Sequence, residues 1–270
     1  MHWIYLSPHL DDVVLSCGGL VWEQTRLDQP VDIWTICAGD PPEGPLSPFA
    51  QELHARWQTP RDAAQQRRQE DIASCGVLSA GYFHFSIPDC IYRRSHRETS
   101  RLRDLAGAGH ADTEELFLYA SEQALFSPVH PSEKRLVRKL TKDLVRTLPT
   151  GAEVVCPLAL GGHVDHRLTR QVVEGLSQSG AKLISPWYYA DYPYVLRMPE
   201  YAENLLREGW QAVLHPISPA GLDAWGQGVA AHQSQISSFW PSVESMHAAL
   251  REYWVAQGGI YLWKAPLDAG

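Results

Sequence analysis

The feature that most constrains the fold is a regular alternation between short apolar runs and longer segments with helical character. Several of the runs are continuously apolar, which is typical of buried strands in a parallel sheet. Strands are expected at 3–6, 31–38, 82–87, 153–158, 182–189 and 211–217. Helices are expected at 12–27, 61–75, 132–148 and 165–179, and over most of 220–255. This order predicts an α/β fold with a mostly parallel sheet, helices on both faces and a ligand site at the carboxyl edge of the strands.

The length of 270 residues is compatible with one large domain or two small ones. The sequence contains no repeat, low-complexity tract or Ser/Gly linker that would divide it. We therefore expect a single domain over 1–270, with loop insertions at about 40–57 and 91–130. Because both insertions follow expected strands, they should overhang the edge of the sheet where ligands bind.

The charge of the chain argues against some classes of partner. With 23 Lys and Arg against 31 Asp and Glu, the formal net charge is −8, so we expect no nucleic-acid or anionic-membrane partner. No apolar run approaches the roughly 20 residues that span a bilayer, and the first residues do not resemble a secretory signal. These features favour a cytoplasmic protein. The five cysteines include no CxxC pair and are odd in number, so we expect buried free thiols rather than a disulfide framework.

Two polar motifs directly follow expected strands. They are residues 8–12 (Pro-His-Leu-Asp-Asp) and residues 161–166 (Gly-Gly-His-Val-Asp-His). Residues three apart at the start of a helix share one face, so the histidine and second aspartate of the first motif can pair, as can the two histidines of the second. Taken alone, Asp11 or Asp12 could be a helix N-cap, and a single histidine could be a polar core residue. Two such clusters at strand ends together favour a metal site.

Imidazole and carboxylate groups are ligands that suit zinc, and catalytic zinc sites have three protein ligands and an open position for water. Zinc lowers the pKa of its water to about 7, which makes hydroxide available near neutral pH. Asp11 and Asp165 would remain as unliganded carboxylates beside the metal. One of them could take the proton of the water, and the other could orient a neighbouring histidine.

The two motifs together resemble those of the PIG-L/LmbE-like family of zinc-dependent deacetylases of the N-acetylglucosamine type. Residues 67–70 resemble the Arg-x-x-Glu helix of that family, residues 188–194 its aromatic strand and Asp-x-Pro-Tyr turn, and residues 232–236 its late Ser-Gln helix. The resemblance covers most of the chain and implies a Rossmann-like α/β fold. The family motif His-Pro-Asp-Asp-Glu has Leu10 and Val13 here in place of its proline and glutamate, neither of which is a metal ligand.

The resemblance also implies roles for individual residues. His9, Asp12 and His166 would bind zinc, although another divalent transition metal would also suit these ligands. Asp11 would be the general base, and a protonated His163, tuned by Asp165, would stabilise the oxyanion or act as the acid. The residues implied on the substrate side are Arg67, Asp89 and Tyr192.

The implied reaction is removal of an acetyl group from a small N-acetylated sugar or glycoconjugate by attack of zinc-bound water. The alternatives are a zinc amidase acting on another non-peptide amide, such as a thiol conjugate, and a catalytically silent carbohydrate-binding protein. A nicotinamide-dependent oxidoreductase is disfavoured because no GxGxxG follows the first strand. A homo-oligomer is left open by the sequence.

Two groups of side chains near the motifs allow two interpretations each. The aromatic residues at 187–194 suit sugar rings, but they also suit ordinary core packing. The five arginines between 93 and 103 indicate either a solvated loop or a lid that meets an anionic substrate.

Overall fold

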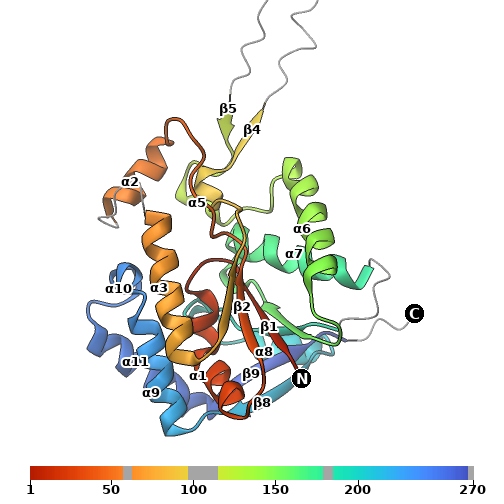
Figure 1. The fold of residues 1–270 in the computed structure, drawn as a ribbon, viewed down its shortest axis with the longest axis vertical. Coiled ribbons are helices and arrows are strands. Elements are labelled where there is room, and N and C mark those ends of the chain that lie inside the picture. Colours follow the sequence, from red (N-terminus) through yellow and green to blue (C-terminus); the bar gives the residue numbers. More distant parts are fainter. Residues whose placement is uncertain (57–62, 97–114, 179–184, 267–270) are drawn as a thin grey trace, which may run out of the picture.

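The computed structural model describes residues 1–56, 63–96, 115–178 and 185–266. A seven-stranded sheet runs through the molecule in the order β3-β2-β1-β6-β7-β9-β8 (Figure 1). The first five strands of this order are parallel, whereas β9 runs antiparallel to β7 and β8. The strands are β1 (Trp3–Ser7), β2 (Val31–Thr35), β3 (Gly81–His84), β6 (Glu153–Pro157), β7 (Trp187–Tyr189), β8 (Gln211–Pro216) and β9 (Gly259–Lys264). The predicted α/β class with a mostly parallel sheet is confirmed.

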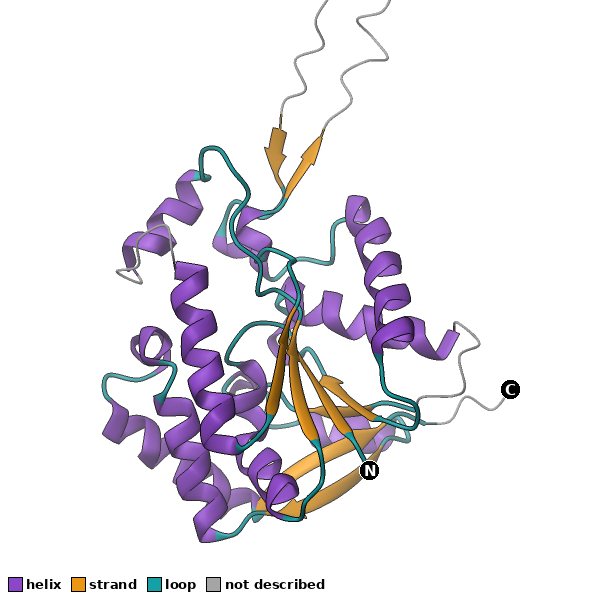
Figure 2. Cartoon of the chain, in the orientation of Figure 1, coloured by secondary structure: helices purple, strands orange, loops and turns teal. Residues whose placement is uncertain are grey.

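Helices cover both faces of the sheet (Figure 2). α1, α3, α9 and α11 pack together on one face, and the pair α6 and α7 lies on the other. The helices are α1 (Asp12–Arg26), α2 (Pro48–Arg56), α3 (Ala63–Leu78), α5 (Glu122–Leu125), α6 (Lys134–Thr147), α7 (Val164–Gln178), α8 (Tyr201–Arg207), α9 (Pro219–Ala230), α10 (Gln233–Phe239) and α11 (Val243–Gln257). Among the described residues, none of these helices combines the length and the apolar character of a membrane span.

The sequence explains why β1 and α1 lie at the centre. All five residues of β1 are buried, as expected of a parallel strand with a neighbour on each side. α1 contains Gly18 although glycine is a poor helix former. A Cβ atom at Gly18 would lie 2.6 Å from Cδ1 of Trp225, so glycine lets α1 and α9 approach closely. The Trp225 indole N–H then donates a hydrogen bond to the carbonyl oxygen of Val14 over 2.8 Å.

Some expected boundaries differ from the observed ones. α3 continues past Gly76 to Leu78, because Cys75 and Leu78 are fully buried and extend the helix into the core. The strands expected at 31–38 and 82–87 end earlier, at Thr35 and His84. The helical character expected over 220–255 is confirmed by α9, α10 and α11, and the strand β9, which was not expected, follows them and returns to the sheet between β7 and β8. Residues 61–62 of an expected helix and 182–184 of an expected strand lie outside the described residues.

The strand order reverses between β1 and β6. From β1 the sheet extends through β2 to β3, and β6 then lies on the other side of β1. In open α/β sheets, ligands bind at such a point, beyond the carboxyl ends of the strands. One polar motif follows β1 and the other follows β6. The fold therefore brings the two motifs together at the edge where the sequence predicts a site.

Both insertions form structure beyond this edge. The first contains α2, and the second contains α5 and an antiparallel pair of short strands. A small hydrophobic core that includes Leu53, Ile91 and Tyr119 joins the two insertions. The short elements are β4 (Arg94–His96), β5 (Glu115–Phe117) and the 3-10 helices η1 (Cys90–Tyr92), η2 (Pro131–Glu133), η3 (Leu160–Gly162) and η4 (Tyr194–Arg197). Residues 57 and 97–114 of the insertions lie outside the described residues.

Candidate active site

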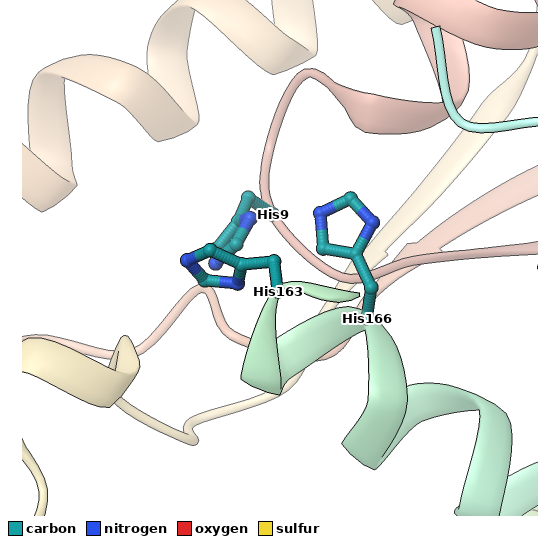
Figure 3. A group of neighbouring side chains, drawn as sticks. All are labelled: His9, His163 and His166. Atoms are coloured by element: carbon teal, nitrogen blue, oxygen red, sulfur yellow. The ribbon is translucent and has the colours of Figure 1, made fainter. Parts of the chain in front are cut away.

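Three histidines from the two motifs meet at the carboxyl edge of the sheet (Figure 3). His9 follows β1, His163 immediately precedes α7, and His166 lies in the first turn of α7. The centroid of the His9 ring lies 5.0 Å from that of His163 and 5.6 Å from that of His166. One nitrogen from each ring lies within 4.8 Å of the other two, so the group could hold a metal ion.

The Asp12 carboxylate lies between two of these histidines. Its Oδ2 is 3.1 Å from Nδ1 of His9, and its Oδ1 is 3.3 Å from Nε2 of His166. The backbone N–H of His9 also donates to Oδ2 of Asp12 over 2.8 Å, which holds the turn between β1 and α1. The structure thus brings together the three side chains that the sequence predicts as metal ligands.

The second nitrogen of each predicted histidine ligand is held by a buried carboxylate. Nε2 of His9 lies 3.0 Å from Oδ2 of Asp165, and Nδ1 of His166 lies 2.6 Å from Oδ1 of Asp191. Metal-ligating histidines commonly have such a partner, because it fixes the tautomer and the orientation of the ring. In each ring the other nitrogen faces Asp12 and is the one that a metal ion could bind in place of a proton. Two imidazoles and one carboxylate arranged in this way fit a divalent transition metal with three protein ligands.

The charges around the histidines support the same fit. Although burial disfavours the charged ring, the Asp12 and Asp191 carboxylates raise the pKa of His166 to about 10. Against the same effect of burial, Asp12 and Asp165 raise the pKa of His9. A divalent cation bound by His9, Asp12 and His166 would replace the positive charge of these two protons.

Asp11 takes no part in these contacts and lines a cavity. It occupies the N-cap position of α1, as one interpretation of the sequence has it, but its side chain does not make the hydrogen bond to first-turn amides that this interpretation expects. Its Oδ1 lies 3.3 Å from the guanidinium of Arg67. The cavity has a volume of about 440 Å³, within the range of roughly 300–1,000 Å³ typical of small-molecule sites. Its polar lining includes Asp11, Arg67, His9, Asp12, Asp89 and His163.

His163 differs from the expectation of a protonated ring. Burial and the positive charge of His9 lower its pKa to about 4, so the ring is neutral at neutral pH. Nδ1 of His163 accepts a hydrogen bond from the backbone N–H of Asp165 over 3.3 Å, which leaves Nε2 as the N–H donor. The Asp165 carboxylate contacts His9 instead. Asp165 thus orients a neighbouring histidine, as expected, and that histidine is His9; its negative charge raises the pKa of His163 but does not outweigh burial and His9.

Tyr192 does not line the cavity, so its expected contact with substrate was also wrong. Its side chain is 1% exposed and packs against Trp225, Trp240 and Tyr253 in the core. Tyr194 lines the cavity instead, with its ring centroid 5.8 Å from that of His166. The aromatic segment therefore contributes to two parts of the molecule. Tyr192 packs in the core, and Tyr194 lines the cavity.

The other two residues expected on the substrate side do line the cavity. Arg67 reaches it from α3 and pairs with Asp11. Asp89 accepts a hydrogen bond from the backbone N–H of Ile91 over 3.2 Å, and its Oδ2 lies 3.7 Å from Nε2 of His9. Both are placed where a substrate bound beside Asp11 could meet them.

Arg93 fits neither interpretation of the arginine-rich segment. Its side chain is buried, with Nε 2.6 Å from Oε1 of Glu133 and Nη2 2.5 Å from Oδ1 of Asp165. The Tyr119 hydroxyl donates to the other oxygen of Glu133 over 2.5 Å. Arg93 is thus a buried ion-pair partner of the site. The arginines at 97, 101 and 103 lie outside the described residues.

The sequence interpretation missed the roles of Asp191 and Arg93. Asp191 closely follows β7, so the rule that located both polar motifs at strand ends could have identified it. Arg93 carries no such signal, because its neighbours in the sequence include Arg94, Arg97 and Glu98, a composition typical of a solvated loop.

Comparisons with known proteins identify a family and several relatives. The profile of the PIG-L family, described as GlcNAc-PI de-N-acetylase, matches residues 4–176. A 2'-N-acetylparomamine deacetylase from Streptomyces fradiae is 30% identical over 217 residues, which cover 76% of this chain and 62% of that protein. A protein of the same name from Niallia circulans is 27% identical over 227 residues, which cover 77% of this chain and 72% of that protein. The chain therefore spans somewhat less than two thirds of the length of the Streptomyces relative.

Solved structures share the fold. The zinc-inhibited form of teicoplanin deacetylase Orf2 matches with a TM-score of 0.74 at 24% identity, over 100% of both chains. The family profile covers more than half of the sequence and includes both polar motifs. On this evidence the chain belongs to the PIG-L family.

Proposed function

We propose that the protein is a metal-dependent deacetylase that removes an acetyl group from an N-acetylated sugar or sugar conjugate. The observation that carries the proposal is the position of Asp11, a carboxylate that stays outside the His9–Asp12–His166 contacts and lines the same cavity. Membership of the PIG-L family and the similarity to two 2'-N-acetylparomamine deacetylases support the reaction class. Zinc is the proposed metal, because it suits two imidazoles and one carboxylate.

The reaction assigns a role to each of the neighbouring side chains. A bound divalent cation would supply Lewis-acid chemistry, lowering the pKa of water and polarising the amide carbonyl. Asp11 takes a proton from the attacking water as the new C–O bond forms at the amide carbon. The Nε2–H of His163 donates a hydrogen bond to the carbonyl oxygen as negative charge develops there. Asp11 then passes its proton to the nitrogen as the C–N bond breaks, which releases acetate and a free amine.

Other residues position these groups. Asp165 and Asp191 hold the rings of His9 and His166, so that one nitrogen of each ring faces Asp12. Arg67 holds one oxygen of Asp11 from the cavity wall. We further propose that Arg67 and Asp89 meet polar groups of the sugar, because both line the cavity beside Asp11.

The test is acetate release from a panel of N-acetylated amino sugars and aminoglycosides. Release should disappear when a chelator removes the metal, and it should return when zinc is added. Asp11→Asn protein should bind zinc and remain inactive. If zinc-loaded protein with stoichiometric metal releases no acetate from any member of the panel, the deacetylase proposal is wrong. Calorimetric binding of the same sugars without turnover would then favour a silent carbohydrate-binding protein.

A further inference from the structure

The cavity that contains the candidate site has an apolar part that the proposed hydrolysis does not use. Asp11, Asp12 and His163 belong to its polar part, which the reaction requires. Six apolar side chains also line the cavity, and we refer to them as the apolar wall. The apolar wall consists of Phe49, Leu53, Ile91, Leu125, Phe126 and Phe239.

The apolar wall is built mainly by the two insertions and not by the sheet. Five of its six residues lie in the insertions, on α2, on η1 and in or just after α5. Leu53 and Ile91 are buried members of the small core that joins the insertions, and Phe49 and Leu125 pack against that core. The wall is therefore a formed surface, supported from behind by packed side chains.

The wall combines buried side chains with an exposed ring beside His163. Leu53 and Ile91 are buried, whereas Phe126 is 42% exposed. The ring centroid of Phe126 lies 5.8 Å from that of His163, with the two rings almost perpendicular. A ligand that covers an exposed phenyl ring removes apolar surface from water, which favours binding. Small-molecule sites commonly combine such apolar surface with a few polar groups that orient the ligand.

We propose that the apolar wall binds an apolar aglycone, an aryl ring or an alkyl chain that the substrate carries in addition to its N-acetylated sugar. This inference rests on the proposed deacetylase function and specifies its substrate class. The acetyl group has to reach the polar part of the cavity near His9, Asp12 and His166. It is too small to cover the apolar wall as well. The sugar hydroxyls require polar partners. Phe126 lies beside His163 and is exposed. In a 2-acetamido sugar the anomeric carbon is bonded to the carbon that bears the amide, so the group attached to the anomeric carbon lies beside the reacting amide and can contact Phe126.

The first test compares substrates that differ in one group. Zinc-loaded protein is given the methyl, phenyl and hexyl β-glycosides of N-acetylglucosamine, and kcat/KM is measured from acetate release. We expect kcat/KM to be at least about tenfold higher for the phenyl or the hexyl glycoside than for the methyl glycoside, because a hydrophobic pocket discriminates by about this factor for small apolar groups. The phenyl and hexyl arms show whether the wall prefers an aromatic or an aliphatic group. N-decanoylglucosamine is a fourth substrate, which places the apolar chain on the acyl side; its hydrolysis releases decanoate, so kcat/KM is measured from the free amine that forms.

The second test uses variants of the wall. Phe126→Ala and Phe49→Ala should each lower the ratio of kcat/KM for the preferred apolar glycoside to kcat/KM for the methyl glycoside, together by about tenfold. Phe83→Ala is a matched control. Phe83 lies on the edge strand β3, is 43% exposed and does not line the cavity, so its substitution should leave this ratio unchanged.

The outcomes separate this inference from the proposed function. Equal kcat/KM for all glycosides, or preference for N-decanoylglucosamine, would overturn the inference while acetate release still supports the deacetylase. An equal loss on the methyl and apolar glycosides in the Phe126→Ala protein would show that the wall binds the sugar itself. If no substrate is hydrolysed, the deacetylase proposal fails. Calorimetry with the methyl and phenyl glycosides then tests the wall directly, and equal affinities would overturn it.

Discussion

Arg93 and Asp165 form a buried ion pair, with 2.5 Å between Nη2 of the arginine and Oδ1 of the aspartate. The other oxygen of Asp165 lies 3.0 Å from Nε2 of His9, and Glu133 holds Nε of Arg93 at 2.6 Å. A continuous set of contacts therefore joins the second insertion to a predicted metal ligand. The insertion that contributes to the cavity also positions the site.

Replacement of Arg93 should weaken metal binding. Arg93→Met leaves Asp165 and Glu133 as buried carboxylates without this partner, so the free energy of unfolding should fall by about 3–5 kcal/mol. Because Asp165 then holds His9 less firmly, zinc affinity should fall by about 10–100-fold. Competition with a chromophoric chelator measures the affinity, and denaturant unfolding measures the stability.

Arg94→Met is the matched control for this change. The Arg94 guanidinium lies over the ring of Phe117 and donates to the carbonyl oxygen of Pro45, away from Asp165. Its replacement should leave zinc affinity unchanged. If Arg93→Met lowers the stability of the protein but the folded fraction binds zinc as tightly as before, Arg93 is a structural residue and does not position the metal ligand.

Asp11→Asn should separate catalysis from metal binding. The amide cannot accept the proton of the attacking water, so kcat should fall by about 10²–10⁴-fold. Zinc content, measured by atomic absorption, should stay at one per chain. Asp40→Asn is a suitable control, because Asp40 pairs with the neighbouring Arg68 on the surface. Loss of zinc together with activity in the Asp11→Asn protein would contradict the role of Asp11 as the base.

Asp191→Asn should affect metal binding through His166. The carboxylate of Asp191 contacts Nδ1 of His166 at 2.6 Å, and the neutral amide holds the ring and its tautomer less strongly. Zinc affinity should therefore decrease by about 10–100-fold, and His166→Ala should decrease it further because a ligand is removed. Equal affinity in Asp191→Asn and the unchanged protein, measured by chelator competition, would show that Asp191 does not support the metal site.

Substitution of Tyr192 and of Tyr194 should have different consequences. Tyr192→Ala opens a cavity in the core and should lower the free energy of unfolding by about 3–5 kcal/mol. Tyr194→Ala removes a ring from the lining of the cavity and should lower kcat/KM with a smaller change in stability. Thermal unfolding and acetate release measured on both variants test this division. If the Tyr192→Phe protein unfolds at the same temperature as the unchanged protein but has a clearly lower kcat/KM, Tyr192 would contact the substrate after all.

Zinc should stabilise the folded chain, because its ligands come from two segments that meet only after folding. At a free zinc concentration of 100 times Kd, the stabilisation should be about 2.7 kcal/mol. Differential scanning calorimetry with and without a chelator measures the shift in Tm. The His166→Ala protein should show a much smaller shift. An equal shift in that variant would indicate that the stabilising metal is bound elsewhere.

The sequence by itself determined the fold class and the edge of the sheet at which the two polar motifs lie. Continuous apolar runs separated by helical segments require a parallel sheet, and the carboxyl ends of parallel strands meet at one edge. Polar motifs that directly follow β1 and β6 therefore lie close together if these two strands are neighbours in the sheet. The choice of His9, Asp12 and His166 as metal ligands came from the family resemblance, because strand ends and helix starts locate the two motifs but do not say which of their side chains bind a metal.

The tertiary structure alone decided which partners hold these ligands and which side chains line the cavity. Arg93 is buried only because Glu133 and Asp165, far from it in the sequence, compensate its charge. β9 enters the sheet between β7 and β8 through pairing with strands that precede it by many residues. Tyr192 and Tyr194 belong to one turn, where no periodicity indicates which ring faces the core. Such choices depend on contacts between distant segments, and local sequence patterns do not contain that information.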